Sequence, residues 1–141
     1  MRKSVVLAAL VGLLLVPGLL FAHHGTGASY DMHKVVVLKG VVTQFNFSNP
    51  HSQLYFDVTD DSGAVTHWSA EMRNPRNLES AGFTRKQLNE KFAPGAKVEI
   101  TGNPSKAGTP VLVLGKAVTA DGWSLIGAGS PAPGVVGGLV E

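Results

Sequence analysis

The chain has 141 residues, with 12 lysines and arginines, 10 aspartates and glutamates, five histidines and no cysteine. This length suits a single domain, and the lack of cysteine excludes disulfides, thiolate metal sites and a cysteine nucleophile. The formal net charge of +2 comes entirely from Arg2 and Lys3, so the rest of the chain is balanced. A balanced chain argues against general nucleic-acid binding, which needs clustered basic side chains to neutralise phosphates.

The first 22 residues have the pattern of a cleaved secretory signal peptide. Two basic residues precede an apolar run from Val5 to Phe21, and Ala22 then supplies a small residue. A membrane anchor is the alternative interpretation, but a spanning helix usually needs about 20 apolar residues, and Pro17-Gly18 interrupts this run. We therefore expect a periplasmic or secreted protein that keeps no stable membrane span after cleavage.

The position of the cut determines the first residue of the mature chain. Cleavage after Ala22 leaves 119 residues that begin with His23, whereas cleavage after Ala28 would remove both His23 and His24. In the first case, the free α-amine and the imidazole of His23 form a chelating pair for a transition metal. Processing could thus create a site that the precursor lacks.

Three strands are expected at the start of the mature domain. β-Branched and aromatic residues fill 35–47, where Gly40 suggests a bulge or a sharp bend. Residues 53–59 alternate strictly between apolar and polar side chains, and residues 65–72 alternate again. Because 60–63 is rich in turn-forming residues, the second and third strands should form a hairpin.

Two short helices and two further strands should follow. Start and stop residues mark both helices: Asn74-Pro75 and Gly82 for the first, and Thr84 with Gln87 and then Pro94-Gly95 for the second. The later strands are expected at 97–101 and 111–119. Gly102-Asn103-Pro104 and Gly108-Thr109-Pro110 are interpreted as the turns that separate them.

This order of elements predicts a mainly β fold, a small five-stranded OB-like barrel with its helical insert between strands three and four. A small open β-sandwich is the alternative, but it does not explain the position of the helices. The predicted domain covers 23–126, and residues 127–141 form a Gly- and Pro-rich tail that we expect to be flexible.

Histidines are the candidate metal ligands. Mature His23 could bind Cu(II) through its amine and Nδ1, with His24 beside it. His51 is the preferred additional ligand because Pro50 restricts the chain just before the second strand, where an imidazole can point from the barrel rim. A hydrogen bond from His51 to nearby backbone is the alternative.

His67 and Glu71 lie four residues apart and face the same side of the predicted third strand. They could extend the metal site, or they could belong to a solvated face. The metal-site hypothesis therefore comprises His23, His24, His51, His67 and Glu71. No motif for phosphate binding, a nucleophile elbow, zinc hydrolysis or calcium binding is present, so the sequence predicts no catalytic residue and no cofactor other than copper.

Several short motifs carry a resemblance to a known family. They are the histidine pair after Ala22, Asn49-Pro50-His51, Trp68, Glu71, Gly82-Phe83-Thr84 and Pro94-Gly95. With these residues, roughly 20–123 resembles a family of small exported bacterial proteins catalogued as a domain of unknown function. The resemblance implies export and the domain limits, and it implies no activity.

We therefore expect an exported periplasmic module that binds a small ligand, with a copper ion as the favoured choice. The alternative is a metal-free protein-interaction or envelope-associated β module, in which Tyr55, Trp68 or Trp123 supplies contact area for another envelope protein. Trp68 shares a strand face with Ala70 and Met72, and this pattern favours a place in the core.

Overall fold

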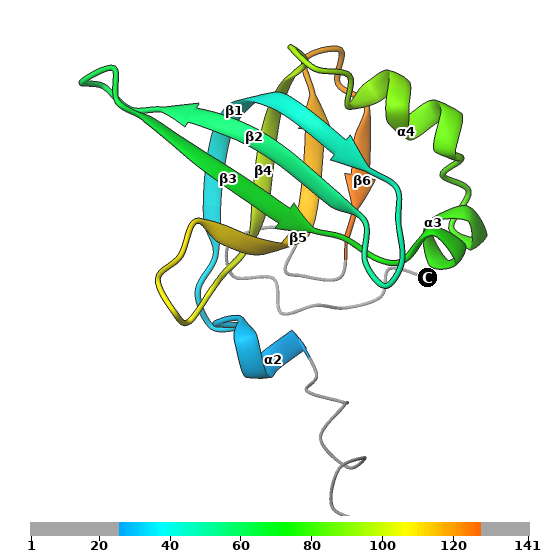
Figure 1. Ribbon diagram of the computed structural model, residues 1–141, viewed down its shortest axis with the longest axis horizontal. Helices are drawn as coiled ribbons and strands as arrows, with labels where there is room; N and C mark the ends of the chain where they lie inside the picture. The colour runs from blue at the N-terminus through cyan, green and yellow to red at the C-terminus, as the bar shows by residue number, and fades with distance from the viewer. Residues whose placement is uncertain (1–25, 128–141) are drawn as a thin grey trace, which may run out of the picture.

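The computed structural model describes residues 26–127 and contains a closed five-stranded β-barrel with a helical insert, as Figure 1 shows. The barrel strands are β1 (Val36–Asn46), β2 (Gln53–Thr59), β3 (Val65–Glu71), β4 (Lys97–Pro104) and β5 (Val111–Thr119). Short elements complete the fold: α2 (Thr26–Ser29), α3 (Pro75–Ser80), α4 (Arg85–Lys91) and β6 (Ser124–Ile126). The predicted mainly β, OB-like barrel is confirmed, with its helices between β3 and β4.

Strand pairing closes the barrel through one parallel contact. β1 pairs antiparallel with both β2 and β4, β2 pairs with β3, and β4 pairs with β5. The parallel pairing of β3 with β5 involves only Ser69–Glu71 and Val111–Val113. The first half of β3 therefore leaves the barrel wall, and Figure 1 shows the tip of the β2–β3 hairpin projecting to one side.

The barrel wall bends at β1. The register shift in β1 lies between Val42 and Gln44, so the bulge suggested at Gly40 occurs three residues later, at Thr43. Gly40 instead permits a close approach to β2, because a Cβ there would lie 2.6 Å from the carbonyl oxygen of Asp57.

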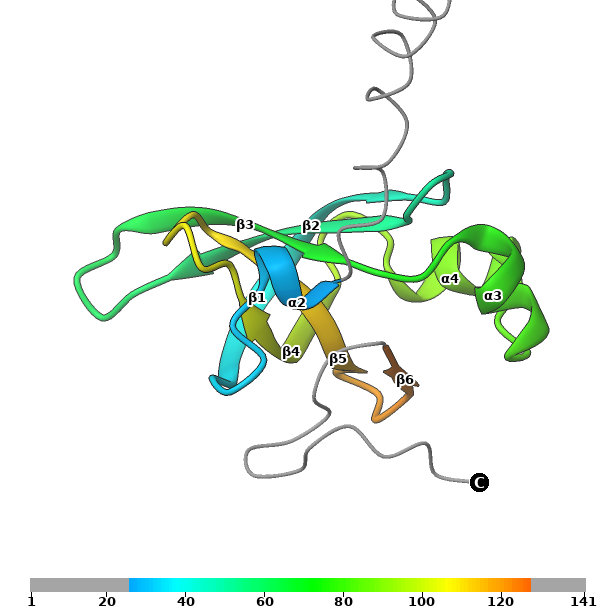
Figure 2. The same ribbon diagram turned by 90° about the horizontal axis from the view of Figure 1, so that it is seen from below.

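Alternation along the strands divides core from surface. Leu54 and Phe56 of β2 are fully buried, while Tyr55 lies between them on the outer face. Leu78 and Leu88 add apolar side chains from α3 and α4, and Figure 2 shows both helices at one side of the barrel. Trp68 packs against this core as expected, but it is only partly buried.

The N-cap residues predicted for α3 and α4 cap these helices in the structure. The Asn74 side chain accepts a hydrogen bond from Asn77 N at 2.8 Å, and the Thr84 hydroxyl accepts one from Gln87 N at 3.2 Å. These bonds satisfy backbone donors that the first helical turns leave open.

One predicted turn is wrong. Gly102-Asn103-Pro104 continues β4, because a register shift at Thr101/Gly102 lets the strand bend without ending. The Asn103 side chain then donates a hydrogen bond to the carbonyl oxygen of Lys34 at 2.8 Å, which holds the segment before β1 against β4.

The proposed signal peptide, His23, His24 and residues 128–141 lie outside the described part of the chain. Between residues 26 and 127, none of the helices has the length and apolar character needed to cross a membrane.

Candidate functional site

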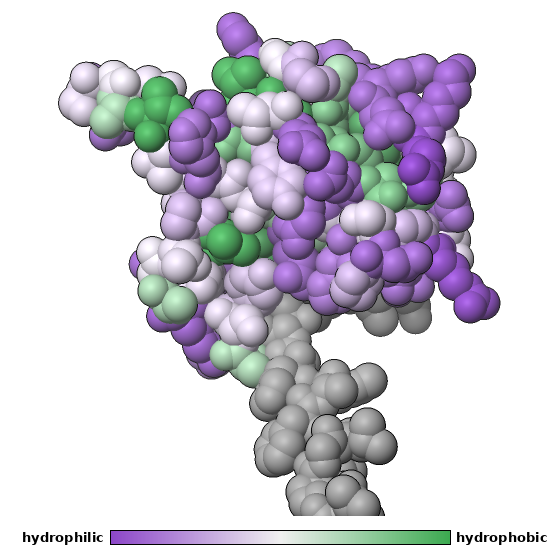
Figure 3. Space-filling view, viewed as in Figure 1, coloured by the Kyte–Doolittle hydropathy of each residue, from purple (hydrophilic) through white to green (hydrophobic). Residues whose placement is uncertain are grey.

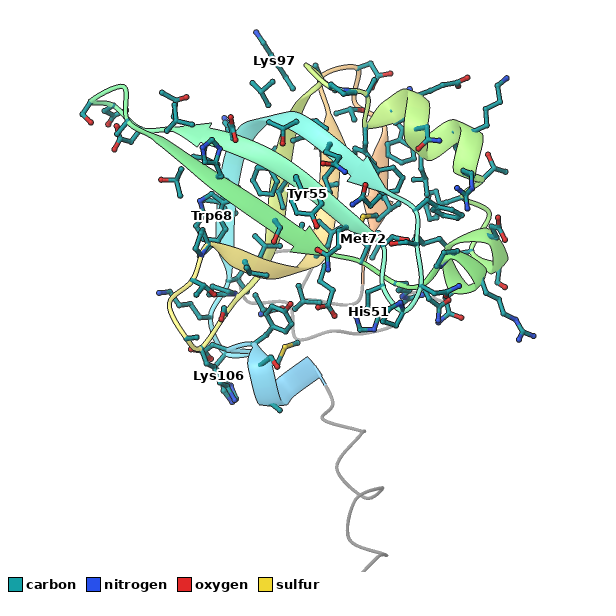
Figure 4. The ribbon with its side chains drawn as sticks, in the orientation of Figure 1. His51, Tyr55, Trp68, Met72, Lys97 and Lys106 are labelled. Atoms are coloured by element: carbon teal, nitrogen blue, oxygen red, sulfur yellow. The ribbon has the colours of Figure 1, made fainter. Side chains whose placement is uncertain are left out.

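The extended end of the β2–β3 ladder positions His51. Ser52 N donates to Arg73 O at 3.2 Å, and Met72 N donates to Ser52 O at 2.9 Å, so pairing continues beyond the two strands. The Ser52 side chain is fully buried. Because side chains alternate along extended chain, His51 faces outward beside Glu71, at the barrel end labelled in Figure 4.

Glu71 joins two side chains that are far apart in sequence. Its Oε1 lies 2.7 Å from Nδ1 of His51, and its Oε2 accepts a hydrogen bond from the Tyr30 hydroxyl at 2.8 Å. The Glu71 side chain is 22% exposed and that of His51 is 51% exposed. One carboxylate therefore orients a half-exposed imidazole and fixes a more buried phenol.

Tyr30 anchors the segment that leads into the barrel. The residue is only 6% exposed, and it forms an isolated β-bridge with Ser105. Next to it, Asp31 N donates to Pro104 O at 2.9 Å and Lys106 N donates to Ser29 O at 3.0 Å. Burial, reinforced by the hydrogen bond and the negative charge of Glu71, raises the pKa of Tyr30 well above its ordinary value.

This arrangement leaves one nitrogen of His51 available. A carboxylate accepts the Nδ1 proton, so in the neutral ring Nε2 carries a lone pair. Histidines that bind metals commonly donate their other ring N–H to a carboxylate in this way. Glu71 is thus placed to hold the ring in position.

His67 forms a separate pair. Its Nδ1 lies 2.6 Å from Oδ1 of Asp57, the residue directly opposite on β2, and its side chain is 82% exposed. Four residues along a strand span about 13 Å, so His67 and Glu71 share a face without sharing a partner.

The structure therefore brings together two of the five sequence-derived metal-site residues, His51 and Glu71. His67 pairs with Asp57, and His23 and His24 lie outside the described residues. Residues 26–127 contain no cluster of three or more histidine, aspartate or glutamate side chains that could hold a metal ion. Any further ligand near His51 would have to come from outside that range or from another type of donor.

Sequence reasoning missed the roles of Tyr30 and Asp57. Tyr30 meets Glu71 across 41 residues of sequence, and no local pattern indicates such a contact. The second pair could have been found, because the hairpin register that opposes Thr59 to Val65 also opposes Asp57 to His67.

Comparison with protein families finds a match for most of the chain. Residues 12–113 match the model of a family described as a family of unknown function, DUF6152. A search of curated proteins finds no match to this chain.

Proposed function

The chain belongs to the DUF6152 family of unknown function, and from its own geometry we propose that it is an exported module that binds a copper ion between His51 and the mature N-terminus. Glu71 is the observation that carries the proposal. The same carboxylate orients the ring of His51 and anchors Tyr30, seven residues after the proposed first residue, His23.

The available donors suit copper. His51 offers Nε2, and a mature His23 would add an amine and an Nδ1. Three nitrogen donors in one plane favour Cu(II), whereas thiolate coordination is excluded because the chain has no cysteine. His24 is a further imidazole in the same short segment.

The distance along the chain is compatible with this site. Seven extended residues reach at most about 25 Å, so Tyr30 limits how far the amine of His23 can lie from the barrel rim. Residues 26–29 are helical, which shortens the reach further. Export is proposed from the sequence pattern of residues 1–22, which is typical of proteins sent to the periplasm or out of the cell.

Two measurements test the proposal. Intact mass of the exported protein should identify His23 as the first residue, and titration with Cu(II) at neutral pH should give sub-micromolar binding. His51→Ala should weaken binding strongly because it removes a ligand, and Glu71→Gln should weaken it about 10- to 100-fold by releasing the ring.

His33→Ala is the matched control, because His33 is exposed in the segment before β1 and its backbone N–H, not its ring, binds Asp31. Extension of the chain before His23 should abolish tight binding. A mature chain that begins after Ala28, or copper affinity that is unchanged in His51→Ala, would reject the metal site and favour the metal-free interaction module.

A further inference from the structure

A second surface feature lies on the outer face of the β2–β3 hairpin, away from His51. A groove of about 490 Å³ runs between this hairpin, the end of β1 and the start of β5. Its residues are Thr43, Gln44, Tyr55, Asp57, His67, Trp68, Ser69, Pro110 and Val111. Tyr55, labelled in Figure 4, lies on the outer face of β2, whereas Trp68 pairs with buried Phe56 and borders the groove from the core side of β3.

The parallel closure of the barrel creates this groove. β3 contacts β5 only from Ser69 onward, so Trp68 lies where the two strands separate. Trp68 also lines a second hollow of about 350 Å³, beside the loop between β4 and β5. That second hollow contains Lys34 and Lys106, so the absence of basic side chains is a property of the first groove alone.

Polar groups in the groove are fixed and varied. Asp57 holds His67 by Nδ1 at 2.6 Å, which leaves Nε2 of the neutral ring as an outward acceptor. Gln44 donates to Asn46 at 2.7 Å and keeps its amide oxygen available. Within residues 26–127, the hydroxyl of Tyr55 has no hydrogen-bond partner, so it can both donate and accept.

OB-type barrels bind both oligonucleotides and oligosaccharides, and the charge of the groove indicates which of the two fits here. None of its lining residues is lysine or arginine, and Asp57 contributes a carboxylate. Such a surface cannot neutralise the phosphates of a single-stranded nucleic acid. Figure 3 shows mostly residues of hydrophilic or intermediate hydropathy on this face, with small separated hydrophobic areas, so the face also lacks a broad apolar surface for a protein partner.

We propose that the groove formed by Tyr55, Asp57, His67 and Trp68 binds a neutral oligosaccharide. The ring of Tyr55 offers a flat surface for the apolar C–H face of a sugar ring, and the partly exposed Trp68 borders the groove. The acceptors of Asp57, His67 and Gln44, together with the Tyr55 hydroxyl as a donor, match sugar hydroxyl groups, which need both kinds of partner. The face of strands two and three, flanked by the loop before the fifth strand, is also where OB-type barrels bind oligosaccharides.

The test uses the full mature protein with cellotetraose, chitotetraose and maltotetraose as probes. A chelator is present throughout, so the outcome is independent of the proposed copper site. Calorimetric titration of the unaltered protein measures affinity. Trp68 fluorescence is followed in Trp123→Phe, because Trp123 packs against Phe83 and Phe92 away from the groove.

At least one tetraose should bind saturably and change Trp68 fluorescence. His67→Ala should weaken that binding about three- to tenfold through one lost hydrogen bond. Tyr55→Thr, which keeps a β-forming residue, should weaken it about tenfold. His33→Ala, an exposed histidine outside the groove, should leave the affinity unchanged.

Several results would overturn the proposal. The first is that none of the three tetraoses binds at millimolar concentration. The second is binding that His67→Ala and Tyr55→Thr leave unaffected. The third is tighter binding of oligothymidylate than of any tetraose. Circular dichroism verifies that each variant is folded before its titration is interpreted.

Discussion

Glu71→Gln is the substitution that most sharply tests the Tyr30–Glu71–His51 arrangement. The change preserves size and shape but replaces one acceptor oxygen by an amide donor. Glutamine can therefore accept from either Tyr30 or His51, but not from both. In the protein, the two bonds measure 2.8 Å and 2.7 Å, and the Tyr30 residue is 6% exposed.

The expected loss follows from which bond breaks. A hydrogen bond to a charged group contributes about 1.5–3 kcal/mol, and an unsatisfied buried donor costs about 1–3 kcal/mol. The contact with His51 contributes less because that ring is half-exposed. We expect Glu71→Gln to lower the free energy of unfolding by about 2 kcal/mol, which corresponds to a Tm lower by about 10 °C for a domain of this size.

Urea unfolding at pH 7, followed by circular dichroism, measures this loss. Tyr30→Phe and the double variant complete a thermodynamic cycle. The two substitutions should be non-additive, because Tyr30→Phe removes the hydrogen bond that Glu71→Gln deprives of its charged acceptor. A loss below about 0.3 kcal/mol for Glu71→Gln, or additive effects within the cycle, would refute the reasoning.

Three further predictions concern other parts of the molecule. Gly102→Ala should lower the free energy of unfolding by about 1–3 kcal/mol in urea titration, because a Cβ there would lie 2.3 Å from Val113 O; an unchanged midpoint would contradict the close approach. The hydrogen bond from Lys91 is the largest of the interactions that lower the pKa of Asp121. Asp121→Asn should therefore lower the free energy of unfolding above pH 4, and the difference between the two proteins should fade at lower pH. A difference that does not depend on pH would contradict this linkage. The raised pKa of Tyr30 means that the folded protein holds the phenol proton more tightly than the unfolded chain does. The contribution of Tyr30 to the free energy of unfolding should therefore be fully present below pH 10 and be lost as the pH rises further. An absorbance titration of phenolate in which Tyr30 ionises at its ordinary pKa in the folded protein would contradict this prediction.

Local patterns were sufficient to predict most of the fold. Strict alternation predicted a strand at 53–59, and a strand was also expected at 111–119 after the turn residues Gly108-Thr109-Pro110. These ranges are the observed bounds of β2 and β5. The capping residue Thr84 gave the start of α4. The position of the helices then favoured one topology, because an OB-type barrel has its insert between the third and fourth strands.

The remaining features depend on contacts between distant segments. The course of β4 through Gly102 requires a bulge that no turn-residue pattern distinguishes from a true turn. Tyr30 finds Glu71 only once β3 and the segment before β1 meet at one end of the barrel. His51 was recognised as a candidate from its place after Pro50, whereas its carboxylate partner became evident only from the paired strands.

Electron paramagnetic resonance of the one-to-one Cu(II) complex tests the central claim most directly, in the exported protein that begins with His23. The account predicts hyperfine coupling from three in-plane nitrogens, and the loss of one of them in His51→Ala. A spectrum that His51→Ala leaves unchanged would contradict the account.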